Sequence, residues 1–304
     1  MRKKEKKFKI KKKLTITTSN KIDFAVIFEV KNANPNGDPL NENIPRYDSN
    51  RIGEITDVCL KRKIRNRLLD KGKNIFVQSN DYRRQGDEYK NLKERLEGII
   101  GKISKNEDEK EYKKKICEKF FDVRAFGQVI AWDKQSIGIR GPVTIQSAYS
   151  IASIKIISNQ ITKSVSNEKD DGKGSDTMGM KHYVKTGIYV FKGAINPQLA
   201  EKTGFSYDDA QEIKDILPRI FENDESSARP AGTMKVLNLI WWEHKSEIGE
   251  FSSAKVHSSL KIDENGTIIN EKELKEGSVN EIKSSRSEER RVGKECRSRW
   301  SPYH

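Results

Sequence analysis

The sequence predicts an α+β fold whose elements follow the order strand, helix, strand, strand, helix, strand. "DFAVIFEV" (residues 23–30) alternates in polarity, as a strand does. Residues 56–70 repeat apolar side chains at helical spacing, and "TMKVLNLIWWEH" (233–244) reads as a strand that is apolar on both faces. This is the ferredoxin-like order, which RNA-recognition modules share, although the same order serves many functions.

The first strand and the first helix carry the clearest local signals. Four residues of the strand share one face, which predicts a half-buried strand: Phe24, Val26, Phe28 and Val30. Thr56 is expected to cap the helix and Gly72 to end it. Leu60, Ile64 and Leu68 form its buried stripe. Five basic residues are expected on its other faces: Lys61, Arg62, Lys63, Arg65 and Arg67.

The remaining elements are less regular. Residues 40–55 are expected to be irregular, and 78–119, dense in mixed charges, are expected to form an exposed helical insertion. Residues 136–151 read as a strand pair or one long bent strand, and 163–187 as a polar loop. Residues 188–195 form a strand. Ser206 caps a helix that should run to about Asn223, with a bend at Pro218.

Most of the positive charge lies at the two ends of the chain. The first 13 residues contribute +8 and the last 19 contribute +3, which leaves +3 of the formal +14 for the rest. We expect residues 1–19 to be a flexible basic tail, or alternatively a nucleic-acid arm. Residues 286–304 look like translated sequencing-adapter DNA, so we expect them to be non-native and the natural C-terminus to be missing. Net charge alone therefore does not establish a nucleic-acid binder.

Composition also excludes several classes of protein. No apolar run approaches the roughly 20 residues of a membrane span, so we expect no membrane partner. There is no recognisable signal peptide. Apart from the adapter-like tail, the cysteines are Cys59 and Cys117, with no metal-ligand spacing. We therefore expect a reducing, cytoplasmic setting and no cofactor.

A series of short motifs is more specific than any of these features. They include "NPNGDP", "PRYD", "TDVCLKRKIRN", "DVRAFG", "IRGPVTIQS", "SDTMGMKH", "YVFKGAIN" and "FENDESSARPAG", in this order. Over about residues 20–263 the set resembles the backbone subunit of the type I-C CRISPR Cascade complex, the Csd family of the RAMP superfamily.

The resemblance implies a protein that is not an enzyme. Copies would stack head to tail along one CRISPR RNA, beside other Cascade subunits, and present the guide for pairing with target DNA. Residues 20–285 would form the domain, with an RRM-like palm, helical fingers at about 78–120 and a β-hairpin thumb at about 150–187. The thumb would push one guide base out of line at regular intervals.

The residues predicted to contact RNA lie in several of these motifs. They are Asn34, Asn36, Arg46, Lys61, Arg62, Arg65, Arg140, Gln146, Met178, Met180, Lys181, His182 and Arg229. Basic side chains would neutralise phosphates, and the methionines would wedge between bases. The prolines and Gly37 would make "NANPNGDP" a rigid loop that faces the guide.

Alternatives remain open at each of these places. The loop could be a structural turn or face a neighbouring subunit, the helix face could be merely solvated, and the methionines could pack against another copy. Arg229 could be a structural cap. The chain could also be an endoribonuclease that uses Asp38 with a metal, or His182 with Lys181. A third possibility is a stand-alone RRM-type RNA-binding protein.

Overall fold

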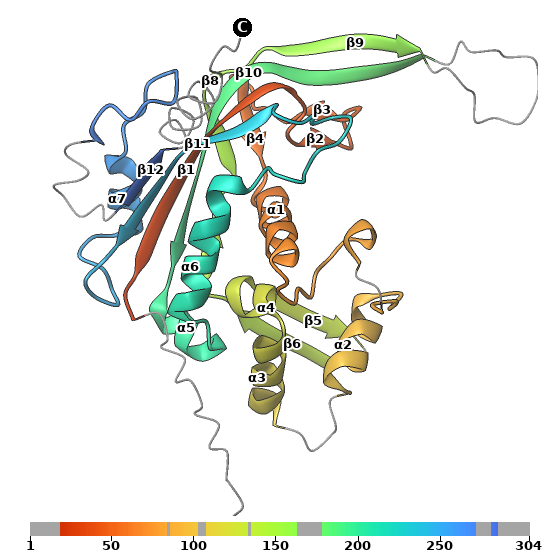
Figure 1. Cartoon of the computed structure of the whole chain (residues 1–304), viewed down its shortest axis with the longest axis vertical. Helices are drawn as coiled ribbons and strands as arrows, with labels where there is room; N and C mark the ends of the chain where they lie inside the picture. Colours follow the sequence, from red (N-terminus) through yellow and green to blue (C-terminus); the bar gives the residue numbers. More distant parts are fainter. Residues whose placement is uncertain are drawn as a thin grey trace, which may run out of the picture.

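A computed structural model describes residues 19–83, 86–102, 108–132, 135–162, 178–271 and 281–284 (Figure 1). The architecture is mixed α/β around one large antiparallel sheet. Its strands follow the order β12 (Glu281–Ser284), β11 (Met234–Glu243), β1 (Ile22–Ala33), β10 (Met178–Ile195), β8 (Ala148–Ser153) and β4 (Ile52–Ile55). Two further strands pair with β10, namely β7 (Val143–Ile145) and β9 (Ile156–Thr162).

Strand β1 is buried on both faces, whereas the sequence predicted burial of one face. Phe24, Val26 and Phe28 pack in the main core on the helical side. Ala25 and Ile27 pack on the opposite face, in a second cluster that includes Val256 of helix α7 (Ser253–Ser259). The half-buried prediction was therefore wrong, because the segment after β11 covers the face that was expected to be exposed.

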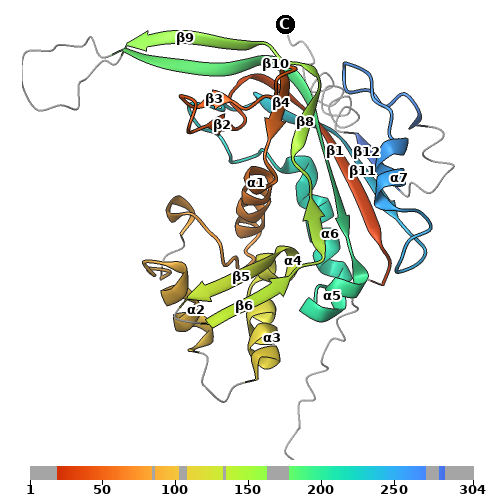
Figure 2. The same ribbon diagram turned by 180° about the vertical axis from the view of Figure 1, so that it is seen from behind.

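Helices α1 (Asp57–Asp70), α5 (Pro197–Thr203) and α6 (Tyr207–Ile216) cover the other face of the sheet (Figures 1 and 2). The predicted helix starts are confirmed. The Thr56 hydroxyl accepts a hydrogen bond from the Cys59 N–H, and Ser206 and Asp209 form a capping box. Helix α6 ends earlier than predicted, at Ile216. A 3₁₀ turn that contains Pro218 follows it (η2, Leu217–Arg219).

The predicted helical insertion has a small core of its own. Residues 78–119 contain the 3₁₀ turn η1 (Asn80–Tyr82), α2 (Leu92–Ile100) and α3 (Glu109–Lys119). Helix α4 (Phe121–Phe126) and the hairpin β5 (Gly127–Trp132) and β6 (Gln135–Arg140) follow directly. Leu96 and Ile116 are buried together with Phe76 and Phe120, which flank these residues. The insertion is thus a packed subdomain rather than a set of exposed helices.

Two stretches that were expected to be irregular contain strands. Residues 40–55 include β3 (Ile44–Pro45) and β4, and β3 pairs with β2 (Gly37–Asp38) in the preceding loop. Residues 178–186, predicted to be part of a polar loop, belong to β10 and pair with β9 or β1. Residues 163–177 of that predicted loop lie outside the described residues, as do residues 1–18 of the basic tail and the adapter-like residues 286–304.

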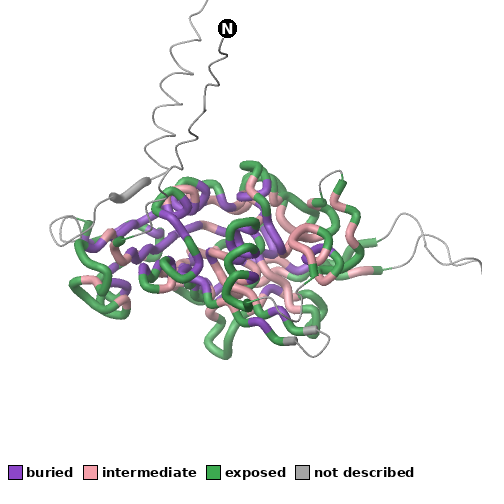
Figure 3. Tube along the Cα trace, turned by 90° about the horizontal axis from the view of Figure 1, so that it is seen from below, coloured by how far each residue is buried: buried purple, intermediate pink, exposed green. Residues whose placement is uncertain are grey.

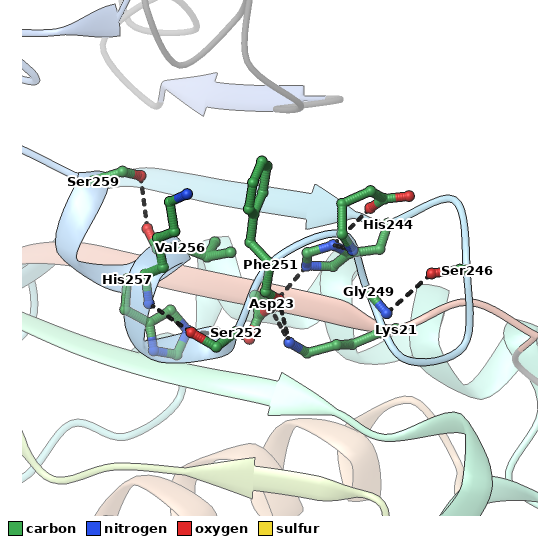
Figure 4. A network of polar contacts seen from close by, with 12 residues as sticks. Lys21, Asp23, His244, Ser246, Gly249, Phe251, Ser252, Val256, His257 and Ser259 are labelled. Atoms are coloured by element: carbon green, nitrogen blue, oxygen red, sulfur yellow. Dashed lines mark hydrogen bonds and ion pairs between the residues drawn. The ribbon is translucent and has the colours of Figure 1, made fainter.

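A buried polar network fastens the segment after β11 to the start of β1 (Figure 4). The fully buried Asp23 carboxylate lies 2.9 Å from His244 Nε2 and 3.3 Å from Lys21 Nζ. The other ring nitrogen of His244 lies 2.9 Å from Glu250 Oε2. Burial lowers the pKa of His257, while Asp23 acts in the opposite direction. His257 donates from Nε2 to the Gly193 carbonyl at 3.1 Å.

The buried segments run through the middle of the molecule and the exposed ones form its outside (Figure 3). Hairpin β9–β10 projects from one end of this body, over β2 and β3, in both views (Figures 1 and 2).

Candidate nucleic-acid interface

Four segments that are distant in sequence meet where β1 ends. The loop after β1 is tied to the loop before β11, because the Asn34 N–H donates to the Ala228 carbonyl at 2.9 Å. It is also tied to the start of α1, because Asn36 Oδ1 accepts from the Thr56 N–H at 3.0 Å. The root of hairpin β9–β10 adjoins both, since Ala33 pairs with Val184. We call this region the loop end of the sheet.

The "NANPNGDP" loop is held by its own side chains. Asn34 is 4% exposed and donates to the Asn43 carbonyl at 2.6 Å, while Asn36 also accepts from the Thr56 hydroxyl at 3.1 Å. Both amides are thus engaged inside the protein, although each was predicted to contact the guide. A Cβ on Gly37 would lie 2.7 Å from the Asn43 carbonyl oxygen, so close packing rather than a positive φ requires glycine here.

Arg46 and Asp38 face each other across the β2–β3 hairpin. Arg46 Nη2 lies 3.2 Å from Asp38 Oδ1, which also accepts from the Leu40 N–H. The Arg46 side chain is 31% exposed, so part of the guanidinium faces solvent. The Asp38 carboxylate, the candidate nuclease residue, therefore has two partners within its own loop.

The basic residues of α1 divide into buried and exposed groups. Lys63 is 4% exposed and pairs with Asp224, although it was predicted to lie on an outer face. Arg65 is 13% exposed and lies 3.0 Å from Asp122, which also accepts from the Phe76 and Val77 N–H groups. These two cations thus join α1 to its neighbours. The pairing of Arg65 with Asp122 and its low exposure disfavour the predicted RNA contact.

The other two predicted α1 contacts are more accessible. Lys61 is 25% exposed and lies 2.9 Å from Asp57, one turn earlier. Arg62 is 61% exposed, and its nearest acidic partner, Asp81, is 3.9 Å away. An ion pair at that distance and exposure contributes little, so Arg62 is the α1 cation best placed to contact a phosphate.

The turn before β11 carries Arg229, which shares the Asp224 carboxylate with Lys63. Arg229 Nε donates to Asp224 at 3.0 Å, so this carboxylate accepts from both Arg229 and Lys63. The Ser226 and Arg229 backbones bond each other and close the turn. Arg229 is therefore a structural cap in this state, and its 28% exposed side chain leaves part of the guanidinium open. Burial raises the pKa of the neighbouring Cys59 thiol, against the opposing effect of Lys63.

The hairpin presents the two methionines on one face. Met178 is 64% exposed and Met180 is 50% exposed, and their i, i+2 spacing on β10 places them on the same side. Lys181 is exposed on the opposite side. His182 is 8% exposed and its Nδ1 lies 2.8 Å from the Ser158 hydroxyl, so it stabilises the hairpin from within.

Two predicted contacts lie elsewhere. Arg140 ends β6 and lines a cavity of about 320 Å³ with Lys21 and Asn196, where β1 begins and β10 ends. Gln146 is exposed after β7, and its N–H bonds the Lys192 carbonyl. The structure thus does not bring either residue to the loop end, because β6 and β7 adjoin the opposite end of β10.

Backbone strain gathers at the loop end. The described residues include five non-glycine residues with positive φ: Asn32, Glu42, Asn43, Arg51 and Asn223. Asn32 lies at the end of β1, whereas Glu42, Asn43 and Arg51 lie in the loops around β2, β3 and β4. Asn223 directly precedes Asp224. Such outliers cluster at functional sites, where the surrounding structure holds them in place.

Arg51 is the least expected of the five, and it was not among the predicted site residues. Its φ of 63° is a conformation that glycine and asparagine adopt readily, whereas other residues lose about 1–2 kcal/mol in it. Its guanidinium lies 4.6 Å from the centre of the Tyr47 ring, a contact worth about 0.5–1 kcal/mol at an exposed site. The contact with Tyr47 does not clearly offset the strain. No sequence signal marks Arg51, because its φ is visible only in the fold.

Two further properties of the described residues concern metal binding and membrane insertion. No group of three or more His, Cys, Asp or Glu side chains within the described ranges is arranged to hold a metal ion. None of the helices in that part of the chain is both long and apolar enough to cross a membrane.

Sequence comparison now places the chain in a family. A profile of the family described as CRISPR-associated protein Cas7 matches residues 20–286. The chain therefore belongs to the Cas7 family of CRISPR-associated proteins. A CRISPR-associated protein Cas7 of Haloferax volcanii is 26% identical over 241 residues, which cover 71% of this chain and 68% of that protein.

Solved structures show more distant similarity. A chain described as "CRISPR RNA-guided surveillance complex, pre-nicking" is similar with a TM-score of 0.48 and 12% identity, over 73% of this chain and 77% of that one. A chain of the "Type III-B Cmr-beta bound to cognate target RNA" has a TM-score of 0.39 and 11% identity, over 73% and 61%. The family assignment rests on the sequence match.

The shared carboxylate at the loop end predicts a measurable loss of stability. Asp224→Ala leaves Lys63 buried without its partner, which should lower the free energy of unfolding by about 2–4 kcal/mol in urea titrations. Glu225→Ala is the matched control, because that neighbouring side chain is exposed and should change stability little. Equal, small effects for both variants would show that Asp224 does not hold the two loops together.

Proposed function

We propose that the chain is a CRISPR RNA-binding backbone subunit of a type I-C Cascade complex. Copies of it assemble along one guide, beside other Cascade subunits, and present the guide for pairing with target DNA. The observation that carries this proposal is the loop end of the sheet, where strained loops, exposed cations and a projecting hairpin with two exposed methionines occur together.

The sheet order supports a ferredoxin-like palm. Strand β1 lies between β11 and β10, α1 follows β1, and α6 connects β10 to β11. With β8 beside β10, the strands and helices of the predicted order all have counterparts. The subdomain from η1 to β6 corresponds to the proposed fingers, and hairpin β9–β10 to the proposed thumb.

The chemistry of the loop end suits single-stranded RNA. Such RNA requires cations along its backbone and flat or flexible side chains against its bases. Lys31, Arg62, Lys181 and Lys185 are exposed around the hairpin root and α1. Met178 and Met180 supply unbranched, polarizable side chains that can slide against a base. The ion pairs of Lys63 and Arg65 join α1 to the segments that pack against it.

We propose further that the chain does not cleave RNA. Asp38 is bonded to Arg46 and Leu40, and His182 is buried against Ser158, which favours structural roles for both candidate nuclease residues. Incubation of the purified protein with guide-matched RNA, with and without divalent metal ions, tests this directly. A cleavage product that disappears in Asp38→Ala would contradict the proposal.

The assembly itself is tested by purification. The full chain, expressed with a CRISPR array, should co-purify with RNA of uniform length and repeat-derived ends, as ordered multimers. A monomer that carries RNA of mixed length and sequence would instead support a stand-alone RNA-binding protein.

Arg62 should act through phosphates. Arg62→Ala should weaken RNA binding equally for unrelated sequences. It should also reduce the slope of log affinity against log salt by the amount that about one phosphate contact contributes. Fluorescence anisotropy over a salt series measures both. Lys202→Ala removes an exposed positive charge from α5, at the far end of the sheet, and should leave the slope unchanged. An identical slope for wild type and Arg62→Ala would remove α1 from the interface.

The methionine face should control guide geometry rather than folding. Met178→Ala with Met180→Ala should leave the unfolding transition unchanged, since both side chains are exposed. Each lost base contact should cost about 1 kcal/mol, the low end for stacked side chains, and the loss repeats in every copy. The double variant should therefore blunt the periodic reactivity of the bound guide to chemical probes.

Ile161→Ala is the matched control for this experiment. Ile161 is 45% exposed and pairs with Gly179, so it lies on the opposite face of the hairpin. Its variant should retain the periodic pattern. A periodic pattern that survives in the double methionine variant would place the wedge in another segment.

A further inference from the structure

A rigid turn at the loop end displays an arginine over a tyrosine. Asp48 Oδ1 accepts from the Asn50 and Ile52 N–H groups, both at 2.9 Å, and the Arg51 N–H donates to the Asp48 carbonyl at 3.0 Å. These bonds hold Arg51 at its positive φ. Its guanidinium lies over the Tyr47 ring, and both side chains are exposed.

The arginine at this position is not explained by the turn. The backbone conformation favours glycine, and the Tyr47 contact does not clearly offset the strain of a larger residue. The Arg51 guanidinium also has no salt bridge among those found in the described part of the chain. Among the described residues, the guanidinium is thus left with one face open to a further partner.

The turn also adjoins the root of the hairpin. The Arg51 carbonyl accepts from the Ile154 N–H at 2.8 Å, two residues before β9 begins. The Lys155 carbonyl in turn accepts from the Lys185 N–H of β10. Both lysines are exposed, so the turn shares its neighbourhood with two cations that can meet phosphates.

We propose that Tyr47 and Arg51 form a stacking subsite for one unpaired RNA base, an inference that rests on the proposed RNA-binding function. Unstacked RNA bases are bound on aromatic rings and on guanidinium planes, and this turn offers the two together. A base that the hairpin displaces from the guide finds a flat cationic surface on the same chain, with Lys155 and Lys185 beside it for the flanking phosphates.

The test separates base stacking from phosphate contact. Affinities of the full chain are measured by fluorescence anisotropy for a single-stranded RNA and for the same RNA with abasic nucleotides. Arg51→Gly should lower the affinity for ordinary RNA about five- to twentyfold, and that for abasic RNA less than about twofold. Thermal unfolding of Arg51→Gly should be unchanged or occur at a higher temperature, because glycine relieves the strained φ.

Two further variants sharpen the result. Arg51→Lys keeps the charge but loses the planar guanidinium, so it should lose affinity for ordinary RNA nearly as Arg51→Gly does. Tyr47→Leu removes the aromatic ring that lies under the Arg51 guanidinium. It should also lower the affinity for ordinary RNA more than the affinity for abasic RNA. Lys202→Ala, at the far end, should match wild type on both RNAs.

Each outcome decides the proposal. Equal losses on ordinary and abasic RNA, or full affinity in Arg51→Lys, would show a phosphate contact and overturn the stacking subsite. Unchanged RNA affinity together with shorter multimers would assign the pair to a neighbouring protein and also overturn it. Wild type that binds neither RNA would refute the proposed function itself, whereas tight wild-type binding without any effect of Arg51→Gly would refute only this subsite.

Discussion

The antiparallel pairing of β1 with β10 is the constraint on which the rest of the structure depends. The register runs from Ile22 opposite Ile195 to Ala33 opposite Val184, and β10 then continues without a break beside β9. One 18-residue strand thus belongs to both the core and the hairpin. Tyr189, Phe191 and Ile195 are fully buried, so the core determines where the hairpin emerges.

The same register brings the loop after β1 to the hairpin root. Because β1 ends opposite Val184, the loop must leave the sheet where β10 begins to project. Two carboxylates then fix the surrounding parts: the partly buried Asp224 joins α1 to the turn before β11, and the buried Asp122 joins α1 to the segment at Phe76. Removal of one partner from such an ion pair strongly lowers the free energy of unfolding. These pairs can therefore hold loops in strained conformations.

Positive charge at the loop end therefore has two separate roles. Lys63 and Arg65 form ion pairs with Asp224 and Asp122 and are largely shielded from solvent. Arg62, Lys181 and Lys185 face solvent. This division explains how a body with a formal net charge of only +3 can still offer a cationic surface. The positions of the charges matter more than their sum.

Local signals in the sequence predicted the local structure well. The caps at Thr56 and Ser206 and the core strand at 23–30 depend on residues a few positions apart, and the structure confirms them. Features that depend on distant partners were missed. Lys63 finds its carboxylate 161 positions away, and the second buried face of β1 requires the segment around Val256.

The candidate site shows the same limit. Exposed methionines at 178 and 180 were predicted as polar-loop residues, because their strand partner β9 is separated from them by residues 163–177. The burial of Asn34 and His182, the remote position of Arg140 and the strained φ of Arg51 all follow from tertiary structure. The family resemblance led to the proposed function, whereas periodicity alone indicated only the fold class.

The most direct test of the account is a map of protein–RNA crosslinks. Single-stranded RNA that carries photoreactive uridines is bound to the full chain, irradiated, and the crosslinked peptides are identified by mass spectrometry. We expect crosslinks in residues 31–62, 178–185 and 224–233, and few in α5 or α7 at the opposite end of the sheet. Crosslinks concentrated in residues 197–203 and 253–259 would contradict the claim that the loop end binds RNA.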